Sequence, residues 1–335
     1  PTQFLEVEGA AQHNLKSIDV RIPLGALSVV TGVSGSGKTT LIRQIVYPAL
    51  AQALDISADP PGRYRRLRLP PETLRNVEMV DQKAVGRSVV SNPATYVGVF
   101  TAIRELFAAQ PAARAQQLRA AHFSFNVDGG RCETCEGKGV TTIEMQFLPD
   151  IELTCETCGG KRFKPMVLEV TYEERNIYEV LQMTVTEAMD FFAAELKITQ
   201  RLQQLVDVGL GYLRLGQSVS TLSGGEAQRL KLAAFLHRKE HQPTLYFFDE
   251  PTTGLHFEDI RILMAALQQL VNQGHTVVIV EHNLEVIKCA DWLVDLGPEG
   301  GDVGGHLVYQ GPPEGLPEVA ESITGTYLAP KLARS

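Results

Sequence analysis

The sequence has none of the long apolar segments that mark membrane proteins. No run approaches the roughly 18 apolar residues that a membrane-spanning helix requires, and no secretory signal peptide opens the chain. We therefore expect a cytoplasmic globular protein without a membrane partner. The chain starts at Pro1 rather than at methionine, so we expect it to be an excised piece of a longer protein.

An excess of positive charge is missing as well. The 335 residues carry a formal net charge of −8, which excludes a protein that coats nucleic acid through a uniformly basic surface. A local basic patch is compatible with this total, because binding depends on the local potential. The length and a hydrophobic content of 44% allow one large core or two smaller ones.

Cysteine is scarce, and four of the five cysteines form two pairs with the same spacing. Cys132 and Cys135 form one C-x2-C pair, Cys155 and Cys158 form the other, and 19 residues separate the pairs. Four thiolates in this pattern suit tetrahedral Zn²⁺, and neighbouring glycines allow the tight turns that such a site needs. We therefore predict a zinc site, with a redox dithiol pair as the alternative.

The residues around the cysteines give two further expectations. Cys289 lies in an apolar stretch of helical pattern, so we expect a buried and inert thiol. Four cations lie beside the paired cysteines, and they favour phosphate contact over purely solvated charge. These cations are Lys138, Lys161, Arg162 and Lys164.

A glycine-rich loop indicates nucleotide binding. Residues 32–39, GVSGSGKT, match the pattern G-x4-G-K-[ST] in full and connect a predicted strand to a predicted helix. Backbone N–H groups of such a loop surround a β-phosphate, and the helix N-terminus adds positive potential. We expect Lys38 to contact the β- and γ-phosphates and Thr39 to bind Mg²⁺. The predicted nucleotide-binding residues of the loop are Gly32, Ser34, Gly35, Gly37, Lys38, Thr39 and Thr40.

Two acids, Asp249 and Glu250, end the apolar strand pattern of residues 245–248. A buried carboxylate is costly without a partner, so we expect Asp249 to hold Mg²⁺ through its water shell. Glu250 is expected to orient and polarise the attacking water. A solvated turn is the alternative.

Residues at two other strand ends are candidates for a role in ATP hydrolysis. His282 follows the apolar strand pattern of residues 276–280 and can reach a γ-phosphate from there, although a structural histidine is the alternative. Gln82, at the end of another predicted strand, is a weaker candidate for contact with Mg²⁺ or the attacking water. The predicted catalytic residues for hydrolysis of ATP to ADP and phosphate are Lys38, Gln82, Glu250 and His282.

A second anion-binding element follows at Ser223, Gly224, Gly225 and Glu226. Ser223 and Glu226 form a capping box at the start of a predicted helix, and the glycines leave its first N–H groups accessible. One γ-phosphate does not need two such cradles from one subunit. We therefore predict a composite site, in which these residues close on ATP held by the Lys38 loop of another cassette. This motif set resembles the ATP-binding-cassette (ABC) ATPases, in which ATP joins two cassettes and hydrolysis releases them.

Strand and helix patterns alternate at both ends of the chain, which predicts a parallel sheet covered by helices. We predict a nucleotide-binding core in two parts, residues 1–87 and 241–335. A helical signature domain, residues 88–240, separates them and carries the zinc module at about residues 123–168. The predicted strands of the core are 4–7, 18–22, 27–31, 77–80, 244–248, 276–280 and 292–296, and its predicted helices are 38–54, 258–273 and 283–289. Pro48 is expected to kink the first of these helices. In the signature domain, residues 95–120 are expected to be helical and residues 166–172 to form a short strand.

Six longer segments resemble the UvrA family over nearly the whole chain. They are Phe123–Cys132, Ile143–Asp150, Thr221–Arg229, Asp249–His256, Glu281–Leu284 and Asp295–Gly301. The resemblance corresponds to the C-terminal cassette of UvrA, and the zinc-bearing insertion is specific to that family. It implies an α/β ABC-type P-loop ATPase with a mixed or parallel sheet, a helical signature subdomain and a zinc-binding insertion. ATP or ADP, Mg²⁺ and Zn²⁺ are the implied cofactors.

The resemblance also implies a function in nucleotide excision repair and the SOS response. The family scans double-stranded DNA in an ATP-dependent manner, senses lesions through DNA shape and deformability, and transfers them to UvrB. We expect this sequence to lack the N-terminal cassette and the UvrB-binding domain. The expected partner is therefore a second cassette, and contact with UvrB is expected to be only indirect. The family usually has Thr-Pro-Arg where this chain has Ser88-Val89-Val90, so weaker DNA binding is expected.

Three other interpretations use the same motifs. A UvrA-like protein that removes DNA-bound drugs or protects DNA without incision would carry an identical set. A transporter ATPase subunit is less compatible, because Gln82 and Leu222 are 140 positions apart in the sequence and zinc has no role there. A non-enzymatic scaffold conflicts with the intact catalytic residues.

Overall fold

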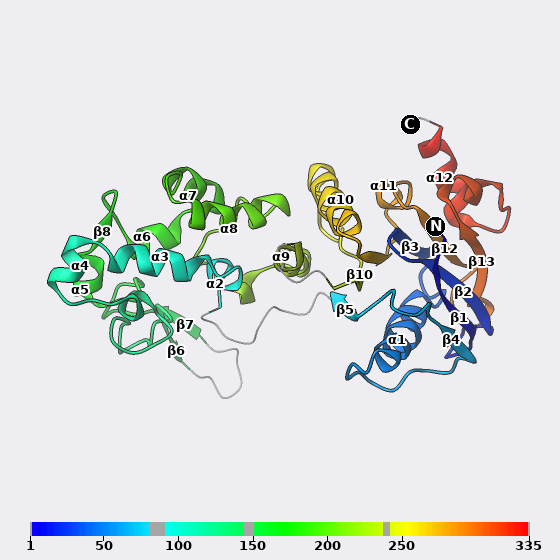
Figure 1. The fold of residues 1–335 in the computed structure, drawn as a ribbon, viewed down its shortest axis with the longest axis horizontal. Coiled ribbons are helices and arrows are strands. Elements are labelled where there is room, and N and C mark those ends of the chain that lie inside the picture. The colour runs from blue at the N-terminus through cyan, green and yellow to red at the C-terminus, as the bar shows by residue number, and fades with distance from the viewer. Residues whose placement is uncertain (1, 81–90, 144–150, 237–241, 334–335) are drawn as a thin grey trace. The chain divides into compact units, whose positions relative to one another are not determined.

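The computed structural model describes residues 2–80, 91–143, 151–236 and 242–333 (Figure 1). The chain forms two compact units, of which unit 1 comprises Pro1–Gln82 with Arg238–Ser335 and unit 2 comprises Lys83–His237. The predicted site residues Gln82 and Ser88–Val90 lie outside the described residues, as does most of the segment 143–150.

Unit 1 is built on a six-stranded sheet in the order β13-β12-β3-β11-β10-β5. All neighbouring pairs are parallel except β12 and β13, so the sheet is mixed, which is one of the two sheet types that the resemblance implied. The antiparallel strand β13 was not among the predicted strands. A second antiparallel sheet has the order β2-β1-β4. The strands are β1 (Phe4–Ala10), β2 (Ile18–Pro23), β3 (Leu27–Gly32), β4 (Arg66–Arg68), β5 (Asn76–Val80), β10 (Thr244–Asp249), β11 (Thr276–Val280), β12 (Trp292–Gly297) and β13 (His306–Gly311).

The helices of unit 1 follow the predicted alternation with the strands. The first helix starts as the π-helical segment η1 and continues as α1 directly after the glycine-rich loop. The helical segments are η1 (Thr40–Val46), α1 (Tyr47–Ala53), α10 (Phe257–Asn272), α11 (Leu284–Ile287), η4 (Gly301–Val303), η5 (Pro313–Glu318) and α12 (Ile323–Leu332).

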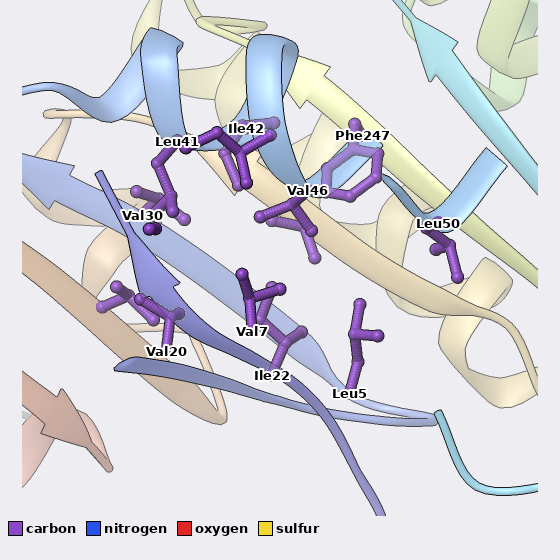
Figure 2. Close-up of a cluster of buried hydrophobic side chains, with 14 of the residues drawn as sticks. Leu5, Val7, Val20, Ile22, Val30, Leu41, Ile42, Val46, Leu50 and Phe247 are labelled. Atoms are coloured by element: carbon purple, nitrogen blue, oxygen red, sulfur yellow. The ribbon is translucent and has the colours of Figure 1, made fainter. Parts of the chain in front are cut away.

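The hydrophobic core of unit 1 joins both sheets to the first helix. Leu5 and Val7 of β1 face the helix from the small sheet, while Phe247 of β10 approaches it from the large sheet (Figure 2). Leu41 and Val46 fill the space between them and are fully buried. This packing fixes the helix that follows the glycine-rich loop, and thereby the loop itself.

Pro48, which we predicted to kink this helix, lies where the π-helical segment passes into α1. Proline has no N–H to donate to the carbonyl four residues before it, which is that of Gln44. The Gln44 carbonyl instead accepts from the N–H of Gly62 at 2.6 Å. The N–H of Tyr47 donates five residues back, to Ile42, so the helix accommodates the proline by a local change of hydrogen-bonding register.

The described residues of unit 2 form short helices and two small hairpins. The helix predicted over residues 95–120 is interrupted at Gly98, whose φ is +72°, and again before Pro111. The strand predicted over 166–172 is wrong in its first part, because Pro165 starts a helical turn there. The elements are α2 (Pro93–Tyr96), α3 (Val99–Ala108), α4 (Pro111–Ala115), η2 (Ala120–Phe123), β6 (Val140–Ile143), β7 (Ile151–Thr154), α5 (Pro165–Leu168), β8 (Thr171–Tyr172), β9 (Arg175–Asn176), α6 (Ile177–Gln182), α7 (Val185–Phe191), α8 (Leu196–Asp207), η3 (Val219–Thr221) and α9 (Gly224–Leu236).

Cys289 contradicts the prediction of a buried thiol, because its side chain is exposed. Helix α11 ends at Ile287, so Cys289 lies in the turn that follows and not on the buried face of a helix. The flanking Ile287 and Ala290 take the buried positions.

Candidate nucleotide and metal sites

The glycine-rich loop connects β3 to η1 and encloses the side chain of Lys38. The Lys38 Nζ donates to the carbonyls of Gly32 and Val33 at 2.8 and 2.9 Å, and the residue is only 8% exposed. Burial lowers the pKa of Lys38, while the negative charges of Glu250, Asp295 and Asp249 oppose that shift. The lysine therefore lies among carboxylates at the same end of the sheet.

Close backbone packing explains why the loop needs glycine. Gly32 has a φ of +130°, and a Cβ at this position would lie 2.0 Å from the carbonyl oxygen of Leu296. The carbonyl of Gly35 accepts from the N–H of Gly301 at 3.1 Å and from Nδ2 of Asn14 at 2.9 Å. Asn14 was not singled out from the sequence, and it buttresses the loop from a segment before β2.

The other predicted loop residues differ in their exposure. Ser34, Gly35 and Thr39 are exposed, whereas Gly37 is buried and Thr40 is half-buried. The exposed positions lie beside the start of the helix, where unpaired N–H groups and the helix dipole favour an anion. The loop can therefore present N–H and hydroxyl groups to a phosphate.

Asp249, at the end of β10, is held by a residue that the sequence did not indicate. Arg43 of η1 approaches one carboxylate oxygen of Asp249 with Nη2 at 2.9 Å and Nε at 3.0 Å. This ion pair connects the first helix to the strand that carries both acids. It also orients the carboxylate that we expected near Mg²⁺.

Glu250 follows in a strained turn. Its φ is +47°, a conformation that costs a residue with a Cβ about 1–2 kcal/mol, and its N–H donates to the Val280 carbonyl at 2.9 Å. Nδ1 of His282 lies 3.8 Å from Oε1 of Glu250. Because β3, β10 and β11 are parallel neighbours, their carboxyl ends bring Lys38, Asp249, Glu250 and His282 together.

The predicted capping box at the start of α9 is confirmed. The Ser223 N–H donates to Oε2 of Glu226 at 2.7 Å, and the Glu226 N–H donates to Oγ of Ser223 at 3.3 Å. Tyr212 donates its hydroxyl to Oε1 of Glu226 at 2.7 Å. Burial alone would raise the pKa of Glu226, but hydrogen bonds from Tyr212 and Ser223 lower it on balance. Ser223, Gly224, Gly225 and Glu226 belong to unit 2 and not to the unit that contains Lys38.

The four paired cysteines converge in unit 2. Their sulfur atoms all lie within 4.8 Å of one another, with Cys132 to Cys155 at 4.0 Å and Cys135 to Cys158 at 3.7 Å. Four sulfurs at about 2.3 Å from a tetrahedral Zn²⁺ are separated by about 3.8 Å, whereas a disulfide requires about 2.05 Å. The donor set therefore fits zinc and excludes disulfides in this arrangement.

The environment of these thiols is uneven. The backbone N–H of Cys158 lowers the pKa of Cys155 to about 7, while burial raises the pKa of Cys158 to about 12. Burial also raises the pKa of Cys135. A metal that binds all four sulfurs must displace their protons, so we expect its affinity to fall as the pH falls.

Two of the four cations beside the cysteines have partners within unit 2. Lys164 forms an ion pair with Glu133. The guanidinium of Arg162 lies 5.3 Å from the ring centroid of Phe125 and donates to the Gly216 carbonyl at 3.3 Å. Lys138 and Lys161 are exposed, which makes them the better placed of the four for contact with a phosphate.

A membrane-spanning segment is not found among the helices that the structure describes, since none is both long and apolar enough.

Comparisons with known proteins show which proteins the chain is similar to. The ABC transporter family matches residues 139–253. UvrABC system protein A of Lactiplantibacillus plantarum is 53% identical over 333 residues, which cover 98% of this chain and 35% of that protein. The protein of the same name from Micrococcus luteus is 55% identical over 331 residues, covering 99% of this chain and 33% of that protein.

The similarity to UvrA proteins is also found in a solved structure. The crystal structure of UvrA2 from Deinococcus radiodurans superposes with a TM-score of 0.89 at 47% identity, over 98% of this chain and 40% of that chain. The chain thus spans about a third of the length of the curated relatives. The expected ABC ATPase fold class is confirmed, and over nearly its whole length the chain is similar to a segment of UvrA-family proteins.

Proposed function

We propose that the chain is the ATP-hydrolysing cassette of a UvrA-type protein, and that it acts on double-stranded DNA in nucleotide excision repair in the cytoplasm. The single observation that carries this proposal is the match to proteins named UvrABC system protein A, which extends over 98–99% of the chain and includes the cysteine-bearing segment. Unit 1 contains the proposed nucleotide-binding residues around Lys38, and unit 2 contains the proposed metal site.

The residues at the carboxyl end of the sheet support a role for each in hydrolysis. The loop N–H groups and Lys38 bind the β- and γ-phosphates, so the Lys38 ammonium exchanges its loop carbonyl acceptors for phosphate oxygens. Thr39 and Asp249 are the groups that would hold Mg²⁺, which neutralises phosphate charge when bound. Arg43 keeps the Asp249 carboxylate in place.

Glu250 and His282 are placed to act on the attacking water. Glu250 orients the water and accepts its proton as the oxygen bonds to the γ-phosphorus and the bond to the ADP oxygen breaks. His282, 3.8 Å from Glu250, donates towards the γ-phosphate. Gln82 remains a proposed contact to Mg²⁺ or the water.

The capping box of α9 supports a composite site. Ser223, Gly224 and Gly225 present a helix N-terminus suited to an anion, and Glu226 is held by the capping box and by Tyr212. We infer that this element completes the nucleotide site of a second cassette, which is the proposed partner of the chain. UvrB is proposed only as an indirect partner of this chain.

Mixing two inactive variants tests the composite site. In Lys38→Ala the glycine-rich loop loses the ammonium that binds the phosphates of ATP. In Ser223→Arg the bulky cation blocks the capped end of the helix. Each variant is therefore expected to be inactive alone. Random pairing makes half of the dimers mixed, each with one intact site, so an equimolar mixture should recover about a quarter of wild-type turnover. Phosphate release is the measurement. A mixture as inactive as its components would refute action in trans.

Duplex DNA tests the proposed substrate. We expect ATP turnover of the wild-type chain to change several-fold on addition of a damaged duplex, and less with the same duplex undamaged, because a deformable lesion costs less to bend. Turnover of Lys38→Ala in the same mixtures is the control for contaminating ATPases. The binding constant should fall with salt, since phosphate contacts release counterions. An ATP turnover rate that changes with neither duplex would contradict the DNA assignment while leaving the ATPase assignment intact.

We also propose that zinc occupies the four-thiolate cluster and holds the segment around it in a defined fold. The hairpin of β6 and β7 is exposed along most of its length and has little core of its own. Structural zinc supplies the folding energy that such a segment lacks.

A further inference from the structure

Glu281 is a buried carboxylate to which none of the roles above has been given. It directly follows β11 and is 1% exposed. One oxygen, Oε1, accepts from the N–H of Thr252 at 3.0 Å and from the hydroxyl of the same residue. The other oxygen, Oε2, accepts from the N–H groups of His282 at 2.9 Å and Asn283 at 3.0 Å. Each carboxylate oxygen therefore accepts hydrogen bonds from a different chain segment.

These two segments carry the groups proposed to act on water. Thr252 lies two residues after Glu250 in the turn that follows β10, and His282 is the first residue of the other segment. The side chains of His282 and Glu250 are 63% and 43% exposed, so burial alone does not fix their positions. Their separation depends on where the two backbone segments are anchored.

The turn at Glu250 needs such an anchor. A positive φ at a residue other than glycine persists only where the surrounding structure over-determines it. On one side the Glu250 N–H is bound to the Val280 carbonyl, and on the other the N–H of Thr253 donates back to the Glu250 carbonyl. Thr252, bound to Glu281 by two hydrogen bonds, connects this turn to the adjacent strand end.

We propose that Glu281 is a positioning residue for ATP hydrolysis, which sets the distance between Glu250 and His282 by binding both segments at once. The inference rests on the proposed ATPase function of this site. Glu281 lies outside the glycine-rich loop and does not contact Lys38 through any hydrogen bond in the described part of the chain. It should therefore affect turnover and not nucleotide binding.

Glutamine is the most informative replacement for Glu281, because its side chain has nearly the same shape as that of glutamate. Its single carbonyl oxygen can accept from one segment only, and its NH2 group then faces the N–H donors of the other. We expect Glu281→Gln to lower kcat about 10-fold or more while the ATP dissociation constant stays within about 2-fold. Glu285→Gln, which removes the carboxylate on the next helix that pairs with Lys288 and Lys331, is the matched control and should keep wild-type turnover.

A pair of variants at Thr252 tests the same contact from its other end. Thr252→Ser keeps the hydroxyl and should turn over ATP like the wild-type chain. Thr252→Val has nearly the same shape without the hydroxyl, and we expect it to lose about 3-fold in kcat with unchanged ATP affinity. This pair decides the question even if Glu281→Gln does not fold, which circular dichroism would report.

Combination with His282→Ala separates positioning from general stability. If Glu281 acts by placing His282, then Glu281→Gln in the His282→Ala background should cost little further turnover. The inference is overturned if the two substitutions reduce turnover by the product of their separate effects. It is also overturned if Glu281→Gln turns over ATP like the wild-type chain, or if its ATP binding falls in proportion to its turnover. Failure of the proposed ATPase function gives a different result from failure of the Glu281 inference. In that case Lys38→Ala would still hydrolyse ATP, or the wild-type chain would not.

Discussion

The Glu250→Gln variant is expected to hydrolyse ATP at least about 100-fold more slowly than the wild-type chain, because a positioned general base contributes about 10²–10⁴ in rate. Glutamine keeps the size of the side chain but cannot accept the proton of the attacking water. The loop around Lys38 is unchanged by this substitution, so ATP affinity should stay within about 2-fold. Since ATP joins two cassettes in the proposed mechanism, the variant should accumulate as a nucleotide-bound dimer.

The measurements are phosphate release, ATP binding at equilibrium, and the apparent mass in the presence of ATP and Mg²⁺. Glu258→Gln provides a matched control, because Glu258 lies on the following helix with a 65% exposed side chain paired to Arg261. This control should behave as the wild-type chain in all three measurements. Normal turnover by Glu250→Gln would reject the role of Glu250, whatever its affinity for ATP.

Loss of one sulfur from the cysteine cluster is expected to have the largest effect on folding. In Cys155→Ser the hydroxyl replaces a buried thiol whose pKa is held to about 7, and an alcohol does not ionise in this range to serve as a comparable ligand. Structural zinc contributes roughly 10–16 kcal/mol of binding free energy to small modules. We expect bound zinc to fall from about one per chain to near zero, with local unfolding of the module.

Zinc content by elemental analysis and limited proteolysis within the module measure this outcome. Cys289→Ser changes a cysteine outside the cluster and should leave both unchanged. Full zinc retention by Cys155→Ser would show that the cluster is not the site.

The same cluster should protect its sulfurs from thiol reagents. A maleimide should modify Cys289 in the native chain, because that thiol is exposed, and the other four only after a chelator removes the metal. Acidification should act like the chelator, since protons compete with the metal for thiolates whose pKa values at Cys135 and Cys158 are raised.

Local sequence was sufficient for those parts of the molecule that depend on short-range geometry. The glycine-rich loop, the capping box of Ser223 and Glu226 and the C-x2-C pairs each place their groups within a few residues of one another. Strand and helix periodicity predicted the sheet of unit 1, because apolar positions repeat with the period of the element that buries them. It failed where one residue changes the backbone, as at Gly98 and Pro165 in unit 2.

Tertiary structure alone decided the contacts that hold the site together. Arg43 and Asp249 are 206 residues apart, Thr252 and Glu281 are 29 apart, and Asn14 reaches Gly301 across 287. No local pattern encodes such pairs, because they depend on which strands become neighbours in the sheet and on the register between them. The exposure of Cys289 follows from the same cause, since it depends on where α11 ends against the sheet and not on the apolar character of the stretch around it.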